Sequence, residues 1–312
     1  MYAVFGNPID HSLSPKIIEV TLKIKSLKIS LDKNIFKKEF ISLLINNNIT
    51  FGNVTYPFKN LIYEFSDYIL YPADKLKSIN CFVFKNGKII STNTDGEGFF
   101  SSLLFNNKEI YNQILRQRFL IIAGSGATAK SIGFSAKIRG INPIFITRNE
   151  KSCLTRYSNS YITKRNNLKN ILSITYKNAT SLIKKKNPII ISTLPFSCIN
   201  ILNQSLSNIK INNINYKKLL NNKDSERIKI DKDITDFFRT AINLNIPIFD
   251  SNYKDYLQLQ LNNISIPENI YSGIDQLIGQ ALHSIYFFNK SNLLNEFEFK
   301  DIKKALFDSC YT

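Results

Sequence analysis

The sequence is poor in cysteine, histidine and acidic residues, and it has no long apolar run. Its 4 cysteines are scattered without a CxxC pair, which excludes a disulfide scaffold, and its 2 histidines are too far apart to suggest a metal site. No stretch approaches the roughly 18 uninterrupted apolar residues of a transmembrane helix. The first residues also lack a basic segment followed by an apolar one. We therefore expect a cytoplasmic protein with no metal and no membrane partner.

The shortage of acidic residues leaves a large positive charge, because 41 Lys and Arg against 24 Asp and Glu give a formal net charge of +17. Such a charge suggests a nucleic-acid or anionic-membrane partner. However, the basic residues are spread through every segment, and no nucleic-acid recognition motif accompanies them. A compositional drift toward Lys, Asn and Ile explains the charge. We expect no nucleic-acid partner, and a non-catalytic basic ligand- or nucleic-acid-binding protein is the less favoured alternative.

The 312 residues, of which 44% are hydrophobic, suffice for about two globular domains. Short β-prone runs in the first third predict strands at residues 2–6, 49–55, 79–84 and 88–92. An Asn86-Gly87 turn joins the last two as a hairpin. Apolar residues at helical spacing follow Pro15 and Pro57, and Ser14 is the expected N-cap of the first helix. This alternation is typical of an α/β domain.

A second α/β unit begins at residues 119–123, an unbroken apolar run typical of a parallel strand covered on both faces. A glycine turn, a helical pattern over 130–139 and a strand at 143–147 complete a βαβ unit. Further strands are predicted at 188–192 and 246–250, and amphipathic helices at 277–288 and 297–307. The expected class is therefore α/β, with an N-terminal α/β domain followed by a doubly wound, Rossmann-type domain.

The glycine turn has the features of a loop that binds the phosphates of a dinucleotide. Residues without bulk let the backbone approach a pyrophosphate, and free N–H groups at the start of a helix point toward it. The residues concerned are Gly124, Ser125, Gly126 and Ala127. An ordinary tight turn is the alternative, because the third glycine of the dinucleotide fingerprint is absent.

The residues after the next strand indicate which dinucleotide is preferred. A carboxylate there would bind the 2′-hydroxyl of NAD, whereas an arginine can pair with the 2′-phosphate of NADP. Thr147, Arg148 and Asn149 occupy this position, and the first acidic residue after the strand is Glu150. NADP is favoured, although a solvated loop charge explains Arg148 equally well.

Polar residues follow or end several apolar runs of the first domain. They are Ser12, Ser14, Asn53, Thr55, Asn80 and the run Asn93-Thr94-Asp95-Gly96. Each by itself is typical of a turn or a cap. The carboxyl ends of strands are, however, where open α/β sheets bind ligands. Together with Lys59, these residues predict a cleft for a small polyhydroxylated carboxylate.

Three N-terminal segments, at residues 6–15, 53–59 and 93–96, resemble the signatures of shikimate dehydrogenase in their order and spacing. Downstream segments resemble the family's phosphate loop, its NADP-selecting loop, and its late cofactor and substrate segments, at residues 124–129, 147–149, 250–253 and 273–280. The resemblance covers nearly the whole chain except the Asn- and Lys-rich residues 200–234, which we interpret as a surface insertion.

The family reduces 3-dehydroshikimate to shikimate with NADPH, on the pathway to chorismate and the aromatic amino acids. The resemblance implies this reversible oxidoreductase activity on a CH–OH group, with Lys59 and Asp95 as the catalytic pair. It implies that Ser12, Ser14 and Tyr253 hold the substrate carboxylate. Contacts to the ring hydroxyls are implied for Asn80, Thr55, Asp95 and Gln280. Cofactor contacts are implied for Gly124, Ser125, Gly126, Ala127, Thr128, Thr147, Arg148, Asn149, Ser251 and Gly273.

The resemblance also implies how the chain is divided. Residues 1–96, completed by C-terminal helices within 277–312, would form the substrate domain, and residues 97–276 the NADP domain. The active site would lie in the cleft between them. The sequence leaves the oligomeric state open, with a homodimer as one option.

The chain departs from the family pattern on the cofactor side. Residues 192–195 read Ser-Thr-Leu-Pro where the family usually has a small polar triplet such as Asn-Ala-Thr. The resemblance implies an apolar residue beside the nicotinamide where this chain has Ser251, and a Met after Gly273 where it has Gln276. These departures concern cofactor affinity, whereas the substrate and catalytic positions are retained. Within the same class, the alternative is a quinate/shikimate dehydrogenase of broader specificity that uses NAD. Ser12 and Arg148 argue against it.

Overall fold

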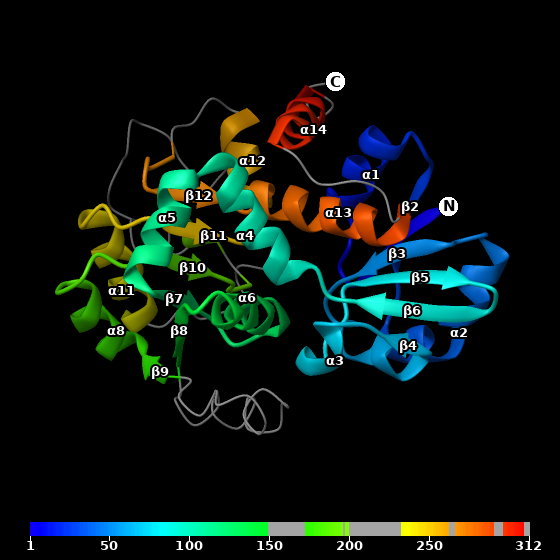
Figure 1. Cartoon of the computed structure of the whole chain (residues 1–312), viewed down its shortest axis with the longest axis horizontal. Coiled ribbons are helices and arrows are strands. Elements are labelled where there is room, and N and C mark those ends of the chain that lie inside the picture. The colour runs from blue at the N-terminus through cyan, green and yellow to red at the C-terminus, as the bar shows by residue number, and fades with distance from the viewer. Residues whose placement is uncertain (149–171, 196, 200–231, 262–265, 290–295, 309–312) are drawn as a thin grey trace.

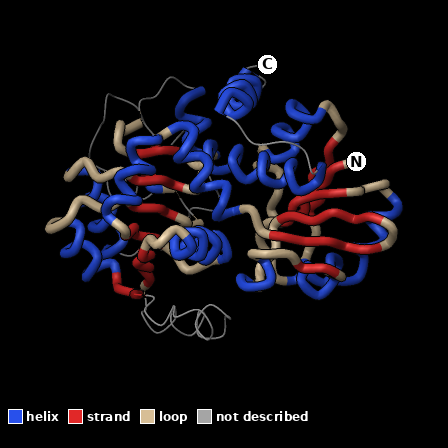
Figure 2. The backbone as a smooth tube through the Cα atoms, viewed as in Figure 1, coloured by secondary structure: helices blue, strands red, loops and turns tan. Residues whose placement is uncertain are grey.

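The structure is a computed structural model that describes residues 1–148, 172–195, 197–199, 232–261, 266–289 and 296–308. Within these residues the chain forms two six-stranded sheets that lie side by side (Figure 1 and Figure 2). Two C-terminal helices, α13 (Ile274–Asn289) and α14 (Glu296–Asp308), return from the second sheet toward the first.

The first sheet is mixed and is built from the N-terminal third of the chain. Its strands are β1 (Tyr2–Gly6), β2 (Ser26–Ser30), β3 (Phe51–Val54), β4 (Tyr68–Ile69), β5 (Cys81–Lys85) and β6 (Lys88–Thr92). They lie in the order β2-β1-β3-β5-β6-β4, with only β5 antiparallel to its neighbours. The associated helices are α1 (Ser14–Leu22), α2 (Lys33–Asn46), the 3-10 helix η1 (Leu61–Phe65) and α3 (Ala73–Leu76).

Strand β1 is buried along its whole length because helices cover both faces of the sheet. Successive side chains of a strand point to opposite faces. Tyr2 and Val4 accordingly pack with residues of α1, α13 and α14. Ala3 and Phe5 pack on the other face against phenylalanines that include those of α2. The C-terminal helices therefore complete the core of the first sheet.

The second sheet is entirely parallel. Its strands are β7 (Phe119–Ala123), β8 (Asn142–Thr147), β9 (Leu172–Thr175), β10 (Ile190–Ser192), β11 (Ile248–Asp250) and β12 (Ile270–Ser272). The helices around it are α4 (Asp95–Asn106), α5 (Lys108–Gln117), α6 (Ala127–Ile138), α8 (Tyr176–Ile183), α11 (Lys232–Asn243) and α12 (Lys254–Leu261). The strand order β12-β11-β10-β7-β8-β9 reverses direction between β7 and β10, and such a switch point opens a crevice for a ligand.

Strand β7 has the same two-sided burial as β1. Leu120 and Ile122 pack with residues of α4, α5 and α6. Ile121 and Ala123 point the other way and pack with residues of α8 and α11. Cover on both faces explains why this strand is an unbroken apolar run in the sequence.

Helices α4 and α13 cross in direct backbone contact between the two sheets. A side-chain carbon on Gly98 would overlap the backbone of Gln280, and one on Gly279 would overlap the carbonyl of Gly98. Only glycine permits this approach. The crossing lies one helical turn after Asp95, the first residue of α4.

The predicted α/β class is confirmed, and each predicted strand is found within a few residues of its expected bounds. Two helix starts differ from prediction. Helix α1 begins at Ser14, after Leu13, so Ser14 is not the N-cap and Pro15 is the second helical residue. Helix α6 begins at Ala127, directly after the glycine turn and earlier than the predicted residue 130. Both helices therefore start at a residue that the sequence had assigned to the preceding loop.

The range expected to be an insertion is partly helical. Residues 200–231 lie outside the described residues, but Lys232 begins α11 and Ile234 is 4% exposed in the core of the second sheet. The insertion prediction is therefore wrong for residues 232–234. Helix α11 has apolar residues at helical spacing, and this face is buried in the core of the second sheet.

Among the described residues, no helix is both long and apolar enough to cross a membrane. The same residues contain no cluster of three or more His, Cys, Asp or Glu placed to hold a metal ion. Two of the cysteines, Cys81 and Cys198, are buried free thiols. Buried thiols of this kind pack as small apolar side chains.

Candidate active site

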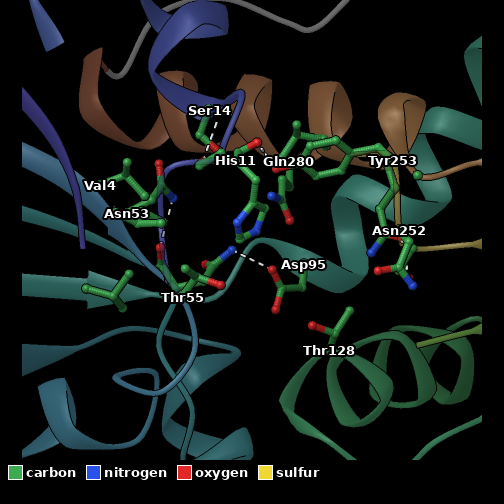
Figure 3. A pocket seen from close by; sticks show the side chains of 18 of the residues that line it. Val4, His11, Ser14, Asn53, Thr55, Asp95, Thr128, Asn252, Tyr253 and Gln280 are labelled. Atoms are coloured by element: carbon green, nitrogen blue, oxygen red, sulfur yellow. Dashed lines mark hydrogen bonds between the residues drawn. The ribbon is translucent and has the colours of Figure 1, made fainter. Parts of the chain in front are cut away.

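A cleft of about 220 Å³ lies where carboxyl ends of strands from the two sheets face each other. Its walls come from the ends of β1, β3 and β11, the first turn of α6, and α13. In Figure 3, Asn53 and Thr55 lie across the cleft from Asn252 and Tyr253, and Asp95 lies between them. Residues far apart in the sequence thus meet in a single polar cavity.

Lys59 and Asp95 form an ion pair in this cleft. The Lys59 Nζ lies 2.5 Å from Asp95 Oδ2 and 3.5 Å from Thr128 Oγ1. The side chains are 14% and 2% exposed, so bulk water screens the pair little. Because desolvating two charges is costly, an ion pair that borders a cleft is a candidate for chemistry rather than for stability alone.

The Asp95 carboxylate is held on both of its oxygens. Oδ2 accepts from Lys59, and Oδ1 accepts from Asn80 Nδ2 at 2.7 Å. Asn80 is fixed in turn, because its Oδ1 accepts from the backbone N–H of Thr94 at 2.8 Å. Asp95 also begins α4, where the helix dipole favours a negative charge. The carboxylate, and through it the ammonium, therefore has a defined position.

Asn53 supports this arrangement from the end of β3. Its Oδ1 accepts from the Tyr2 hydroxyl at 2.9 Å, and burial raises the pKa of Tyr2, which keeps that hydroxyl a donor. Its Nδ2 donates to the Asn80 carbonyl at 2.8 Å and to Ser284 Oγ at 3.2 Å. Asn53 thus connects β1, β3 and α13 behind the catalytic candidates.

Three hydroxyl groups gather at one end of the cleft. Ser12 and Ser14 are largely buried and still line the cavity, and the N–H of Ser14 donates to Ser12 Oγ at 3.4 Å. The Tyr253 hydroxyl accepts from the N–H of Leu13 at 3.4 Å and donates to the carbonyl of His11 at 3.5 Å. Burial raises the pKa of Tyr253, so the group is neutral. This end offers uncharged donors of the kind that suits a carboxylate.

The structure brings together every residue predicted for substrate binding and catalysis. The cleft is lined by Ser12, Ser14, Thr55, Lys59, Asn80, Asp95, Tyr253 and Gln280. They come from separate segments of the chain and from both sides of the cleft. Their individual roles remain predictions.

The glycine turn after β7 leaves the start of α6 open. Gly124 has φ +118, in the region that favours glycine, and a side-chain carbon there would collide with Thr193. Gly126 is the N-cap of α6, and no atom of the described residues lies within 4 Å of the position of a side-chain carbon there. Among the described residues no side chain caps this helix. Its first N–H groups are therefore available to an anion.

The predicted cofactor residues fall into two groups. Those that line the cleft are Thr128, Ser251 and Gly273. Those that follow or end the adjacent strands β7 and β8 are Gly124, Ser125, Gly126, Ala127, Thr147 and Arg148. Arg148 is exposed, and Asn149 lies outside the described residues. Ser251 and Gly273 follow β11 and β12, on the other side of the switch point from β7 and β8, and a dinucleotide bound across that point would reach both sides.

Asp250, the last residue of β11, connects two loops of the second sheet. Its carboxylate accepts from the N–H of Cys198 at 2.6 Å, from the Tyr256 hydroxyl at 2.7 Å, and from the backbone and side-chain N–H groups of Asn252 at 3.1 and 3.0 Å. Asn252 Nδ2 also donates to the Leu194 carbonyl at 3.0 Å. Burial raises the pKa of Asp250. The acid thus ties the loop after β10 to the cleft-lining segment after β11.

The two polar departures from the family pattern meet each other. Ser251 Oγ donates to Gln276 Oε1 at 2.9 Å, and both residues line the cleft. Gln276 comes from the first turn of α13, whereas Ser251 follows β11. A change at one of these positions is therefore physically linked to the other.

Sequence reasoning did not assign some residues of the cleft wall. They include His11, Asn252, Lys254, Gln276 and Leu277. His11, Asn252, Gln276 and Leu277 lie inside segments that carry the family resemblance, which was an available signal for all four. Gln276 was singled out only as a departure. Its position in the wall depends on how α13 returns across the molecule, and no local pattern reports that.

Comparison with known proteins agrees with this geometry. Residues 4–82 match the model of the shikimate dehydrogenase substrate binding domain, a segment that includes Ser12, Ser14, Thr55, Lys59 and Asn80. In this segment the chain is therefore similar to shikimate dehydrogenases.

Shikimate dehydrogenase relatives match either about half or nearly all of the chain. Shikimate dehydrogenase (NADP(+)) of Pelagibacter ubique is 34% identical over 150 residues, which are 47% of this chain and 55% of that protein. The chain thus spans about half the length of the first curated relatives it matches. The Clostridium beijerinckii enzyme of the same name is 25% identical over 301 residues, 95% of this chain and 94% of that one.

The fold is also that of solved shikimate dehydrogenases. The crystal structure of the Thermus thermophilus enzyme in complex with NADP(H) and shikimate has a TM-score of 0.63 to this chain at 13% identity. The match covers 97% of this chain and 98% of that one. At this identity the likeness establishes the shared fold.

Proposed function

We propose that this protein is an NADP-dependent shikimate dehydrogenase, which interconverts 3-dehydroshikimate and shikimate for aromatic amino acid biosynthesis. The observation that carries the proposal is the Lys59–Asp95 ion pair within a cleft lined by hydroxyl and amide groups. This set complements a small molecule that has a carboxylate, one carbonyl and several hydroxyls. The family matches of the N-terminal segment support the same substrate.

The hydroxyl end of the cleft would orient the substrate. Ser12, Ser14 and Tyr253 would donate to the carboxylate, which they can do without a competing charge. Contacts to the ring hydroxyls would come from Thr55, Asn80, Asp95 and Gln280. A substrate anchored at its carboxylate would thus present its opposite side to the ion pair.

Lys59 and Asp95 would handle the proton at the reacting oxygen. Reduction adds a hydride to the carbonyl carbon, and the negative charge that develops on oxygen must be met by a proton. The Lys59 ammonium would stabilise this charge and donate one proton to it, while Asp95 holds the ammonium in position. In the reverse direction the Lys59 amine would accept the proton of the hydroxyl.

NADPH, when bound, would supply the hydride. The residues present fit it, because the open start of α6 can receive the pyrophosphate and, in the part of the chain that the structure describes, no side chain fills the space beside Gly126. Arg148 would pair with the 2′-phosphate. The cleft-lining Thr128, Ser251 and Gly273 would contact the nicotinamide half.

The proposed function carries a domain division with it. Residues 1–96 with the C-terminal helices within 277–312 would bind the substrate, and residues 97–276 would bind NADP. The division is supported by the packing of α13 and α14 against α1 and β1. We place the enzyme in the cytoplasm, and light scattering of the purified protein would test whether it is a homodimer.

Initial rates with shikimate and with quinate, each with NADP+ and with NAD+, test the proposal. We expect an absorbance rise at the reduced-nicotinamide band with shikimate and NADP+, faster than with the other pairs. Equal rates with quinate and NAD+ would replace the proposal by the enzyme of broader specificity. An absence of turnover with all four pairs would overturn the enzymatic function.

A further inference from the structure

Ser251, which the proposed function places beside the nicotinamide half of NADP, forms a polar pair with Gln276, a residue of the cleft wall to which that proposal gives no role. Ser251 Oγ donates to Gln276 Oε1 at 2.9 Å, and Gln276 is only 8% exposed. The two segments are pressed together, because a side-chain carbon on Gly273 would overlap the carbonyl of Ser251. The pair therefore has a defined geometry.

The hydrogen bond between the two side chains leaves a specific set of groups for a ligand. An amide side chain has one acceptor oxygen and two N–H donors, and a hydroxyl has one donor and two lone pairs. The bond engages the Gln276 oxygen and the Ser251 proton. One wall of the cleft thus offers N–H donors from Gln276 Nε2 and an acceptor from Ser251 Oγ.

The strand order indicates which part of a dinucleotide would meet this pair. Under the proposed function, Arg148 would set the adenosine side after β8, on one side of the switch point between β7 and β10. The nicotinamide must then lie on the side of β10, β11 and β12, since a dinucleotide crosses the switch point. Ser251 follows β11, and Gln276 lies in the first turn of the helix after β12. Both also line the cavity that contains Lys59, where the hydride must arrive.

We propose that the Ser251–Gln276 pair recognises the carboxamide of the nicotinamide ring, with Gln276 Nε2 donating to its oxygen and Ser251 Oγ accepting from its nitrogen. A primary carboxamide presents the complement of these groups, namely an acceptor oxygen and two donors. The inference rests on the proposed function, because it takes NADP as the cofactor. It assigns to this chain a polar contact where the family resemblance implies apolar residues.

Calorimetric titrations with two ligands test the pair independently of turnover. The ligands are NADP+ and 2′-phospho-ADP-ribose, which is the same molecule without nicotinamide. We expect Gln276→Met to raise the Kd for NADP+ about two- to tenfold, the range of one neutral hydrogen bond, and to leave the Kd for the fragment unchanged. Gln113→Met on the remote helix α5 is the matched control and should change neither constant.

The 3-acetylpyridine analogue of NADP+ tests the Ser251 contact, because it keeps the carbonyl and replaces the amide nitrogen by a methyl group. The wild type should bind it about two- to fivefold more weakly than NADP+, and Ser251→Ala should remove this preference. The pair's role would be overturned if a variant bound NADP+ and 2′-phospho-ADP-ribose more weakly by the same factor, or if neither variant bound NADP+ more weakly than the wild type. If the wild type does not bind NADP+, the proposed cofactor is overturned as well. If the wild type turns over normally and both variants bind NADP+ with the wild-type Kd, only this inference is overturned.

Discussion

The two halves of the cleft, which we propose to bind the substrate and the cofactor and name accordingly, are organised in different ways. In the substrate half, Asn53 and Asn80 connect the strand ends to the catalytic candidates through one continuous set of hydrogen bonds. In the cofactor half, the buried Asp250 holds two loops together, and the polar Ser251–Gln276 pair lines the wall. The substrate half retains the residues of the family pattern. We expect this retention because each of these residues would contact the substrate or the reacting atoms. The second half can change side chains, since a dinucleotide is bound mainly through backbone groups and a helix start.

Substitution of Lys59 by Met should have the largest effect on catalysis. It removes the proton and the charge at the reacting oxygen, and we expect kcat/KM for shikimate to fall about 10²- to 10⁴-fold. Circular dichroism should show an unchanged fold. Lys37→Met, in an exposed ion pair with Glu64, is the control and should retain full activity. A loss below about threefold for the Lys59 variant would contradict its assignment.

Substitution of Asp250 by Asn should destabilise the cofactor half. In the variant an amide NH2 group replaces one of the two carboxylate oxygens, which now accept hydrogen bonds from N–H and O–H groups. Because an NH2 group cannot accept these bonds, at least one buried donor loses its partner. We expect the free energy of unfolding to fall by about 1–3 kcal/mol, measured by urea denaturation. Asp236→Asn, at an exposed ion pair with Arg239, is the matched control and should change it little. Similar losses in both variants would show that the Asp250 network is not the cause.

Substitution of Ser14 by Ala tests the substrate half at its hydroxyl end. A hydrogen bond to a charged group contributes about 1.5 kcal/mol or more, so KM for shikimate should rise roughly tenfold. The kcat should change little, because Ser14 is assigned to the carboxylate and not to the reacting oxygen. Ser42→Ala on the exposed face of α2 is the control. A lowered kcat with unchanged KM would contradict carboxylate binding by Ser14.

Substitution of Arg148 by Gln should have the smallest effect. Arg148 is exposed, and exposed ion pairs contribute at most about 1 kcal/mol, so KM for NADP+ should rise no more than about fivefold. The KM for NAD+, which lacks the 2′-phosphate, should not change. Arg116→Gln on α5 serves as the control. An equal change in KM for NADP+ and for NAD+ would show that Arg148 is a solvated surface charge and does not recognise the 2′-phosphate.

The sequence predicted the buried strands and the substrate half well for a common reason. Buried strands such as residues 119–123 are continuous apolar runs, and the polar residues that end strands lie where ligands bind. Local pattern and family signature therefore pointed to the same residues. The edge strand β2 and helix α2 were not assigned, since β2 is short and half exposed and its pattern is not continuously apolar.

The contacts of the cofactor half could not be predicted because they join distant segments. Asp250 meets Cys198 and Leu194 lies against Asn252 only after β10 and β11 pair. The Ser251–Gln276 hydrogen bond likewise depends on the return of α13. A sequence pattern records spacing along the chain, whereas these contacts are set by the tertiary packing of the second sheet.

The backbone contact between α4 and α13 has a consequence for how the cleft tolerates change. Asp95 lies one turn before Gly98, and Gln280 follows Gly279, so the same crossing positions a catalytic candidate and a predicted ring-binding residue. Peptide groups, which every sequence has in common, set the separation of the two helices. A chain whose composition drifts toward Lys, Asn and Ile can therefore exchange side chains elsewhere in its core while the spacing of these two residues stays constant.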